Sequence, residues 1–187
     1  MNGAYRFLLD HGIVANAFVG LDPVPGLTEY VEVRDGRTSF LLSSVCDPSV
    51  FDELSGADVW LWHSKQADFP YPEGSQVVGG GTTCLTRAPY LAQMVGWRDI
   101  TVFGADSSFT DKKYCYSQGF AEDSTQPVFP VECDGRTFMT ELALVKQVSA
   151  FGVMHTLFNG CLKFRCGGLM DAFLNSPMRD PREFDPD

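Results

Sequence analysis

The sequence predicts an α/β fold built around a mainly parallel sheet, and two observations indicate it. Short apolar segments alternate with helical segments over the first hundred residues, which is the pattern of α/β proteins. A triple-glycine turn at 79–81 then leads into a helix, and the apolar strand after that helix ends at Asp106-Ser107-Ser108. In parallel α/β sheets, ligands bind at the carboxyl ends of strands and at helix N-termini.

The N-terminal part of the chain supplies most of the expected strands. We expect a helix over residues 4–11 that Gly12 ends, and a second helix from Pro48 to 54 that Asp47 caps. Residues 24–37 are expected to form a loop with one helical turn, and 64–76 a second loop. The strands are expected at 17–21, 39–43, 58–62 and 76–78.

The central segment is expected to form a turn, a helix and a strand. Thr82 or Thr83 is placed to cap the helix, whose apolar residues recur at helical spacing from 84 to 95. Pro89 lies inside this pattern and is expected to kink the helix or delay its start. Gly96 is the expected stop, and the β-rich segment 100–103 is the expected strand.

Beyond residue 110 the alternation becomes less regular. Asp134-Gly135 between two extended segments, 127–133 and 136–138, is typical of a β-hairpin. We expect a helix over 140–151 with Thr140 as its cap, a last strand over 154–158, and a helix over 169–174. The whole is expected to form one domain, 1–175, followed by a charged, proline-rich and flexible tail at 176–187.

Five polar positions lie just after an expected strand, and parallel strands would bring them to one edge of the sheet. The positions are Asp22, Ser43 or Ser44, His63, Thr82 and Asp106. Structural alternatives remain open: the aspartates and serines can be turn or cap residues, and the histidine can be a partly buried group bonded to backbone. The triple glycine before Thr82 can likewise be only a flexible turn.

Charge and cysteine content exclude several classes of function. The chain has 14 basic and 24 acidic residues, a formal net charge of −10, which argues against nonspecific binding to nucleic acid or to an anionic membrane. Its six cysteines form no CxxC pair, which argues against a zinc site. Neither a secretion signal nor a membrane-spanning apolar stretch is visible, so we expect reduced thiols and a cytoplasmic protein.

Three stretches of the sequence resemble one known family. GGGTTCLTRAPYLAQMVGWRDITVFGADSSF at 79–109 is similar to the glycine-threonine turn, helix and acidic strand end of the 6-hydroxymethylpterin diphosphokinase MptE-like family of archaea, bacteria and bacteriophages. NGAYRFLLDHGIVANAFVGLDP and GRTFMTELALVKQVSAFGV resemble its Asn-Gly segment and C-terminal helix. The layout also resembles bacterial sialyltransferases that use CMP-sialic acid. Both resemblances imply a Rossmann-like three-layer sandwich that holds a nucleotide.

The resemblance also implies roles for individual residues. Asn2 matches a nucleotide-side asparagine, and the phosphate or nucleotide loop matches Gly80, Gly81, Thr82 and Thr83. Ser107 and Asp106 match the acidic strand end, and Asp22 matches the aspartate of the family's Asp-Pro step. For diphosphate transfer we expect Mg²⁺ on Asp106 or Asp22, and for glycosyl transfer the catalytic candidates are Asp106, His63 and Tyr114. The family's first strand and Gly-x-Gly-Pro-Ser turn precede its Asn-Gly step and are not in this sequence, so we expect a sheet without that strand.

Three functions follow as hypotheses. The first is a transferase that moves a diphosphate from ATP with Mg²⁺. The second is a glycosyltransferase that uses a CMP- or UDP-sugar and a small-molecule or glycan acceptor. The third is a non-enzymatic phage or mobile-element module for binding or assembly, whose exposed sheet edge would seek a partner strand, for example in a homo-oligomer.

Overall fold

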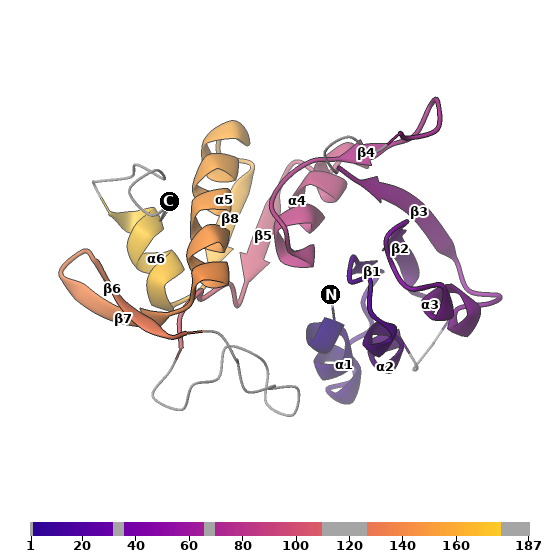
Figure 1. Cartoon of the computed structure of the whole chain (residues 1–187), viewed down its shortest axis with the longest axis horizontal. Helices are drawn as coiled ribbons and strands as arrows, with labels where there is room; N and C mark the ends of the chain where they lie inside the picture. The colour runs from indigo at the N-terminus through magenta and orange to yellow at the C-terminus, as the bar shows by residue number, and fades with distance from the viewer. Residues whose placement is uncertain (1, 32–35, 66–69, 110–126, 177–187) are drawn as a thin grey trace. The chain divides into compact units, whose positions relative to one another are not determined.

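A computed structural model describes residues 2–31, 36–65, 70–109 and 127–176 (Figure 1). The chain divides into two compact units, residues 1–79 and 80–187. Each unit has its own apolar core and is described by itself.

Unit 1 contains a four-stranded parallel sheet in the order β1-β2-β3-β4. In-register residues of parallel strands share a face, so Phe18, Phe40 and Val59 lie on one face, and Leu41 and Trp60 lie on the other. The strands are β1 Ala17–Gly20, β2 Ser39–Ser43, β3 Val59–Ser64 and β4 Val77–Val78.

The helices of unit 1 pack on the face that carries Phe18 and Phe40. Tyr5 of the first helix meets both rings edge-on, with centroids 5.3 and 6.0 Å away. Val31 and Val50, from the next two α-helices, complete this core and are fully buried. The helices are α1 Asn2–Asp10, η1 Pro25–Leu27, α2 Thr28–Val31 and α3 Pro48–Glu53.

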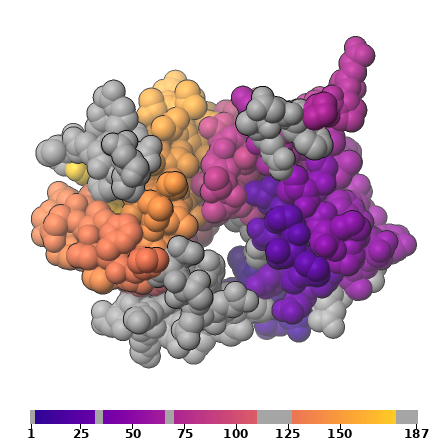
Figure 2. Space-filling model, viewed as in Figure 1, coloured from indigo at the N-terminus to yellow at the C-terminus, as the bar shows by residue number. Residues whose placement is uncertain are grey.

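The described residues of unit 2 form a two-stranded parallel sheet, a β-hairpin and three helices. The sheet pairs β5 with β8, and its buried residues Val102 and Leu162 pack against Phe151 and Met154 of α5. The hairpin of β6 and β7 lies at the surface of this unit (Figure 2). The elements are α4 Cys84–Met94, β5 Ile100–Phe103, β6 Phe129–Cys133, β7 Arg136–Thr140, α5 Leu142–Leu157, β8 Leu162–Arg165 and α6 Gly168–Asn175.

The α/β class, the parallel sheet and the Rossmann-like arrangement predicted from the sequence are confirmed. The hairpin turn is confirmed as well, since Asp134 and Gly135 have φ of +52° and +68°, the left-handed values that a two-residue turn of this kind requires. Asp47 caps α3 as expected: its Oδ1 accepts a hydrogen bond from the Ser49 amide at 2.9 Å. The expected tail lies outside the described residues except for Ser176.

Three expected elements differ. The strand expected at 154–158 is wrong: α5 continues to Leu157, because Val148, Phe151 and Met154 recur every three residues and bury one side of a helix. Thr140 is the last residue of β7 and does not cap α5, whose N-cap is Glu141. Of the two effects expected from Pro89, a kink or a delayed start, the delayed start is wrong, because α4 begins at Cys84 and runs through Pro89.

Among the described residues, no helix combines the length and the apolar character that crossing a bilayer requires.

Candidate functional site

The glycine turn leads directly into the N-terminus of α4. Thr83 is the N-cap, and its Oγ1 accepts a hydrogen bond from the Thr86 amide at 3.2 Å. The Thr86 hydroxyl accepts one in return from the Thr83 amide at 3.2 Å, which completes a capping box. Of the two threonines considered for the cap, Thr83 is therefore the one used, and Thr82 is exposed beside it.

Two glycines of this turn, Gly80 and Gly81, pack closely against two helices of unit 2. A Cβ at Gly81 would lie 2.6 Å from the Thr86 hydroxyl and 3.2 Å from the Ala150 Cβ of α5. Gly80 has a φ of +106°, and a Cβ there would lie 2.8 Å from the Tyr90 ring. Both positions therefore require glycine for packing, and the Gly80 backbone requires it as well.

Arg87 is a buried arginine that the sequence reasoning missed. Its Nε donates a hydrogen bond to the Gly81 carbonyl at 2.6 Å, so the guanidinium holds the glycine turn against α4. A cation in the first turn of a helix opposes the helix dipole, and so an arginine at this position calls for a specific role. This arginine in the first turn of the predicted helix was visible in the sequence, four residues after Thr83.

Asp106 ties the end of β5 to the start of α6. Its Oδ1 accepts a hydrogen bond from the Gly167 amide at 2.6 Å, and its carbonyl accepts one from Met170 at 3.1 Å. Ser108 adds a third link, because its Oγ accepts a hydrogen bond from Leu169 at 3.2 Å. Asp106 thus caps a helix, as one alternative held. The residue is exposed, and its Oδ2 accepts no hydrogen bond from the described part of the chain.

Ser107 faces the interior and has a left-handed backbone, with φ of +53°. Its hydroxyl donates to Gln147 Oε1 at 2.8 Å, and its carbonyl accepts from the Thr140 hydroxyl at 2.9 Å. The serine hydrogen is therefore already used, and Ser107 serves to orient the loop that carries Asp106. Gln147 is a supporting residue that no sequence signal indicated, and Thr140, which was expected to cap a helix, instead supports this loop.

Helix α5 brings the glycine turn and the Asp106 loop together within unit 2. Gly81 approaches Ala150, and Ser107 bonds to Gln147, three residues earlier on the same helix. Residues three apart on a helix are neighbours on one face, roughly 5–6 Å apart. The two loops that the sequence analysis singled out therefore contact the same face of α5, about one turn apart.

The strand-end residues of unit 1 lie on three adjacent parallel strands. Asp22 follows β1, Ser43 ends β2, and Ser44 Oγ is 2.9 Å from His63 Nδ1. The sequence predicts that His63 follows the strand, but in the structure it lies inside β3. The reason is that β4 pairs with His63 and Ser64 and so lengthens the strand. The five predicted strand-end positions are consequently divided between the two units.

Two buried polar atoms at the same strand ends were not foreseen. Ser43 Oγ and Trp62 Nε1 are adjacent in register and have no hydrogen-bond partner within the described part of the chain. Buried polar groups are nearly always paired, so these two are notable. Of the remaining predicted residues, Asn2 begins α1, and Tyr114 lies outside the described residues.

The structure offers a limited set of metal ligands. Among the described residues, no group of three or more histidine, cysteine, aspartate or glutamate side chains is placed to hold a metal ion. Mg²⁺ in nucleotide sites uses one or two carboxylates together with the substrate phosphates. Asp106 fits that role through Oδ2, whereas Asp22, the other predicted ligand, belongs to unit 1.

These features define a class: a Rossmann-like α/β protein with a glycine-threonine turn at a helix N-terminus and an acidic strand end beside it. The chain belongs to the 6-hydroxymethylpterin diphosphokinase MptE-like family, whose model matches residues 1–112. The family resemblance inferred from the sequence is thereby confirmed. No curated protein matches the chain.

One solved structure shares the fold. The MAf glycosyltransferase from Magnetospirillum magneticum AMB-1 superimposes with a TM-score of 0.68 at 18% sequence identity. The match covers 89% of this chain and 27% of the glycosyltransferase, so this chain spans about a quarter of that protein's length.

Proposed function

We propose that this chain is a nucleotide-binding, transferase-type protein and that it serves diphosphate transfer from ATP. The observation that carries the proposal is the packed glycine turn at the N-terminus of α4, which Arg87 holds through the Gly81 carbonyl. The second loop, with Asp106, contacts the same face of α5.

The electrostatics of this arrangement favour phosphate. A helix N-terminus presents positively polarised amides, and glycines let a ligand approach the backbone closely. Arg87 is buried next to the turn and fixes its backbone by donating to the Gly81 carbonyl. In this proposal Gly80, Gly81, Thr82 and Thr83 bind and orient the phosphates.

Mg²⁺ is the cofactor that the proposal includes. Asp106 would hold it through Oδ2, and the ion, when bound, neutralises phosphate charge. The Gly167 and Gln147 hydrogen bonds keep the loop in place, so Asp106 needs no rearrangement to present that oxygen.

A second candidate is glycosyl transfer from a CMP- or UDP-sugar, which the fold shared with a glycosyltransferase favours. This chemistry needs a base and oriented hydroxyl groups. His63, with its ring nitrogen 2.9 Å from the Ser44 hydroxyl, is the candidate base within unit 1.

The test is a thermal-shift titration with ATP, CTP, CMP and UDP, each with and without Mg²⁺. Ligands that bind the folded state raise the melting temperature by mass action. We expect a Mg²⁺-dependent shift with ATP that Asp106→Asn abolishes. A metal-free shift with CMP or CTP would favour glycosyl transfer instead, and no shift with any nucleotide would leave the binding or assembly module as the better hypothesis.

Two controls make the Asp106 result interpretable. Asparagine keeps the Oδ1 that accepts the Gly167 hydrogen bond, so Asp106→Asn removes the charge without removing the helix cap. Asp99→Asn makes the same charge change at an exposed aspartate that pairs with Lys163 at 2.8 Å. If both variants lowered the ATP shift equally, a general charge effect would replace the assigned role of Asp106.

A further inference from the structure

Strand β5 of unit 2 has one edge that no described strand covers. On its other side it pairs with β8: the Ile100 amide donates to the Cys161 carbonyl at 2.9 Å, and the Gly104 amide also bonds to β8, at 3.3 Å. Successive residues of a strand direct their backbone groups to opposite sides. The amides and carbonyls of Thr101 and Phe103 therefore point away from β8, where no described strand pairs with them.

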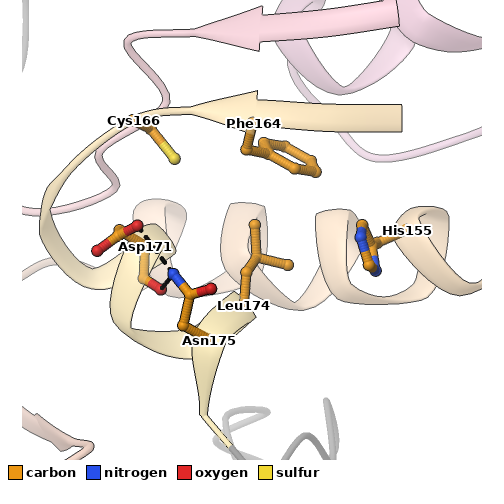
Figure 3. A pocket seen from close by; sticks show the side chains of 6 residues that line it. All are labelled: His155, Phe164, Cys166, Asp171, Leu174 and Asn175. Carbon is orange, nitrogen blue, oxygen red and sulfur yellow. Dashed lines mark hydrogen bonds between the residues drawn. The ribbon is translucent and has the colours of Figure 1, made fainter. Parts of the chain in front are cut away.

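The opposite edge of the same sheet, on β8, is covered. The residues of β8 that direct their backbone groups away from β5 are Leu162 and Phe164. Leu162 is buried in the core of unit 2, and the Phe164 ring points toward α5 and α6. There it lines a pocket of about 170 Å³ together with residues that include Asp171 and Asn175 (Figure 3). The open edge of this sheet is therefore the one on β5.

β5 also lacks the features that keep exposed edges from pairing. Natural edge strands are protected by prolines, charged side chains or covering segments. In the hairpin, β6 carries Pro130 and Glu132, and the outer side of β7 already receives the Phe109 amide, which donates to the Met139 carbonyl at 2.8 Å. β5 instead consists of the strand-forming residues Ile-Thr-Val-Phe, and Phe103 is 72% exposed. An exposed aromatic residue on an unprotected edge indicates a pairing surface.

We propose that β5 pairs with β5 of a second copy of this chain, in antiparallel orientation about a two-fold axis at Val102. Two-fold dimers are the commonest homo-oligomers, and in them the same surface of each copy meets itself. With Val102 on the axis, Thr101 of each copy lies opposite Phe103 of the other. Residues that face each other in this way exchange their amide and carbonyl groups, so every outward backbone group of both strands gains a partner.

The side chains and charges fit this register. Thr101 and Phe103 project from the same face of β5, so each aromatic ring meets a β-branched side chain of the other copy, which is a favourable cross-strand pair. The antiparallel orientation also brings the amino end of one strand, near the exposed Arg98, to the carboxyl end of the other, near the exposed Asp106. A parallel pair of β5 strands would bring like charges together instead. This inference does not depend on nucleotide binding.

Amide hydrogen exchange, followed by NMR on the full chain, tests both the pairing and its register. Exchange is compared between about 20 μM and 1 mM, a range in which weak complexes dissociate, with sedimentation velocity to record the mass. We expect the Thr101 and Phe103 amides to be protected only at high concentration, and those of Ile100 and Val102, which face β8, to be protected throughout. A monomer at every concentration, or a dimer whose Thr101 and Phe103 amides still exchange freely, would overturn the proposal.

A variant pair locates the interface. Phe103→Lys places a charge on the edge and removes the aromatic contact, and we expect dimerisation about tenfold weaker or more. Leu157→Lys is the matched control, because Leu157 at the end of α5 is similarly exposed, at 65%, and lies outside β5. Equal weakening in both variants would contradict the assignment to β5. The exchange comparison on the unmodified protein decides the question even if a variant folds poorly.

Discussion

Asp106 Oδ1 accepts a hydrogen bond from the backbone amide of Gly167 at 2.6 Å, and the two residues are 61 positions apart in the sequence. This bond joins the loop after β5 to the N-cap of α6, at the carboxyl edge of the β5–β8 sheet. One oxygen of the carboxylate thus has a structural role, while the other accepts no hydrogen bond from the described part of the chain and is the oxygen that we propose for Mg²⁺. The same side chain therefore allows separate tests of stability and binding.

Replacing Asp106 should separate those two roles. We expect Asp106→Ala to lower the free energy of unfolding by about 1 kcal/mol, the usual cost of losing a helix cap. Asp106→Asn should lower the free energy of unfolding much less, because the asparagine amide oxygen still accepts the hydrogen bond from the Gly167 amide. Urea unfolding monitored by circular dichroism measures both; equal losses in the two variants would mean that charge, and not the cap, stabilises this loop.

Gly168 should tolerate no side chain. Its φ is +60°, and an added Cβ would lie 2.6 Å from the Asp106 carbonyl oxygen and even closer to Ser108 Oγ. We expect Gly168→Ala to cost about 3 kcal/mol of stability, the sum of left-handed strain and overpacking. Gly160→Ala is the matched control, since Gly160 also has a positive φ, +83°, but open space around it. A similar loss of melting temperature in both variants would contradict the contact assigned to Gly168.

Gly81 should matter for the turn that we assign to the nucleotide. An alanine there would press on Thr86 and Ala150, and so should displace the turn and weaken nucleotide binding about tenfold or more. Gly79 has no atom within 4 Å of a built Cβ, so Gly79→Ala should leave packing unchanged. Isothermal titration with the nucleotide found in the thermal-shift experiment provides the comparison. Unchanged affinity in Gly81→Ala would remove the turn from the binding site.

Stability should fall as the pH rises from about 9 to 11. Burial raises the pKa of both Cys46 and Cys166 from 9.0 to about 11. The unfolded chain therefore releases these protons first, and the stabilisation present below pH 9 is lost as the pH passes through the folded-state pKa. Urea unfolding midpoints between pH 8 and 11 should decline less steeply in Cys46→Ala and Cys166→Ala than in the unmodified protein. Parallel pH profiles would show that neither thiol titrates as described.

Removal of the Ser43 hydroxyl should stabilise the folded protein. Its hydroxyl is fully buried and has no partner within the described part of the chain, and an unsatisfied buried group costs about 1–3 kcal/mol. We expect Ser43→Ala to raise the melting temperature. Ser44→Ala is the control, because Ser44 is paired with His63 and its loss should not stabilise the protein. A destabilised Ser43→Ala would indicate that a bound polar molecule satisfies this hydroxyl.

Local patterns in the sequence were sufficient for several elements. The residues 39–43 and 100–103 form strands with the expected bounds, because short β-rich apolar segments next to turn residues have few alternatives. Asp47 caps a helix as expected, and Thr83, one of the two threonines expected at the next cap, caps α4, because capping depends on residues within three positions of each other. The family was also evident, since its motif at 79–109 is contiguous.

Contacts between distant segments were beyond sequence reasoning. The apolar segment 154–158 has the composition of a strand, and its helical state follows from burial against β5 and β8. The extension of β3 through His63 depends on pairing with β4. Arg87, Gln147 and Gly167 acquire their roles only when the chain folds back on itself.

The sequence alone therefore determined the α/β class, the parallel strands, the Asp47 cap and the family of this protein, because each rests on residues close together in the chain. The tertiary structure decided which oxygen of Asp106 is committed, that Ser107 points inward to Gln147, and that the glycine turn packs against α5. It also created the pocket beside Asp171 and Asn175. These features depend on distances between residues tens of positions apart, and such distances are set only when the apolar core forms.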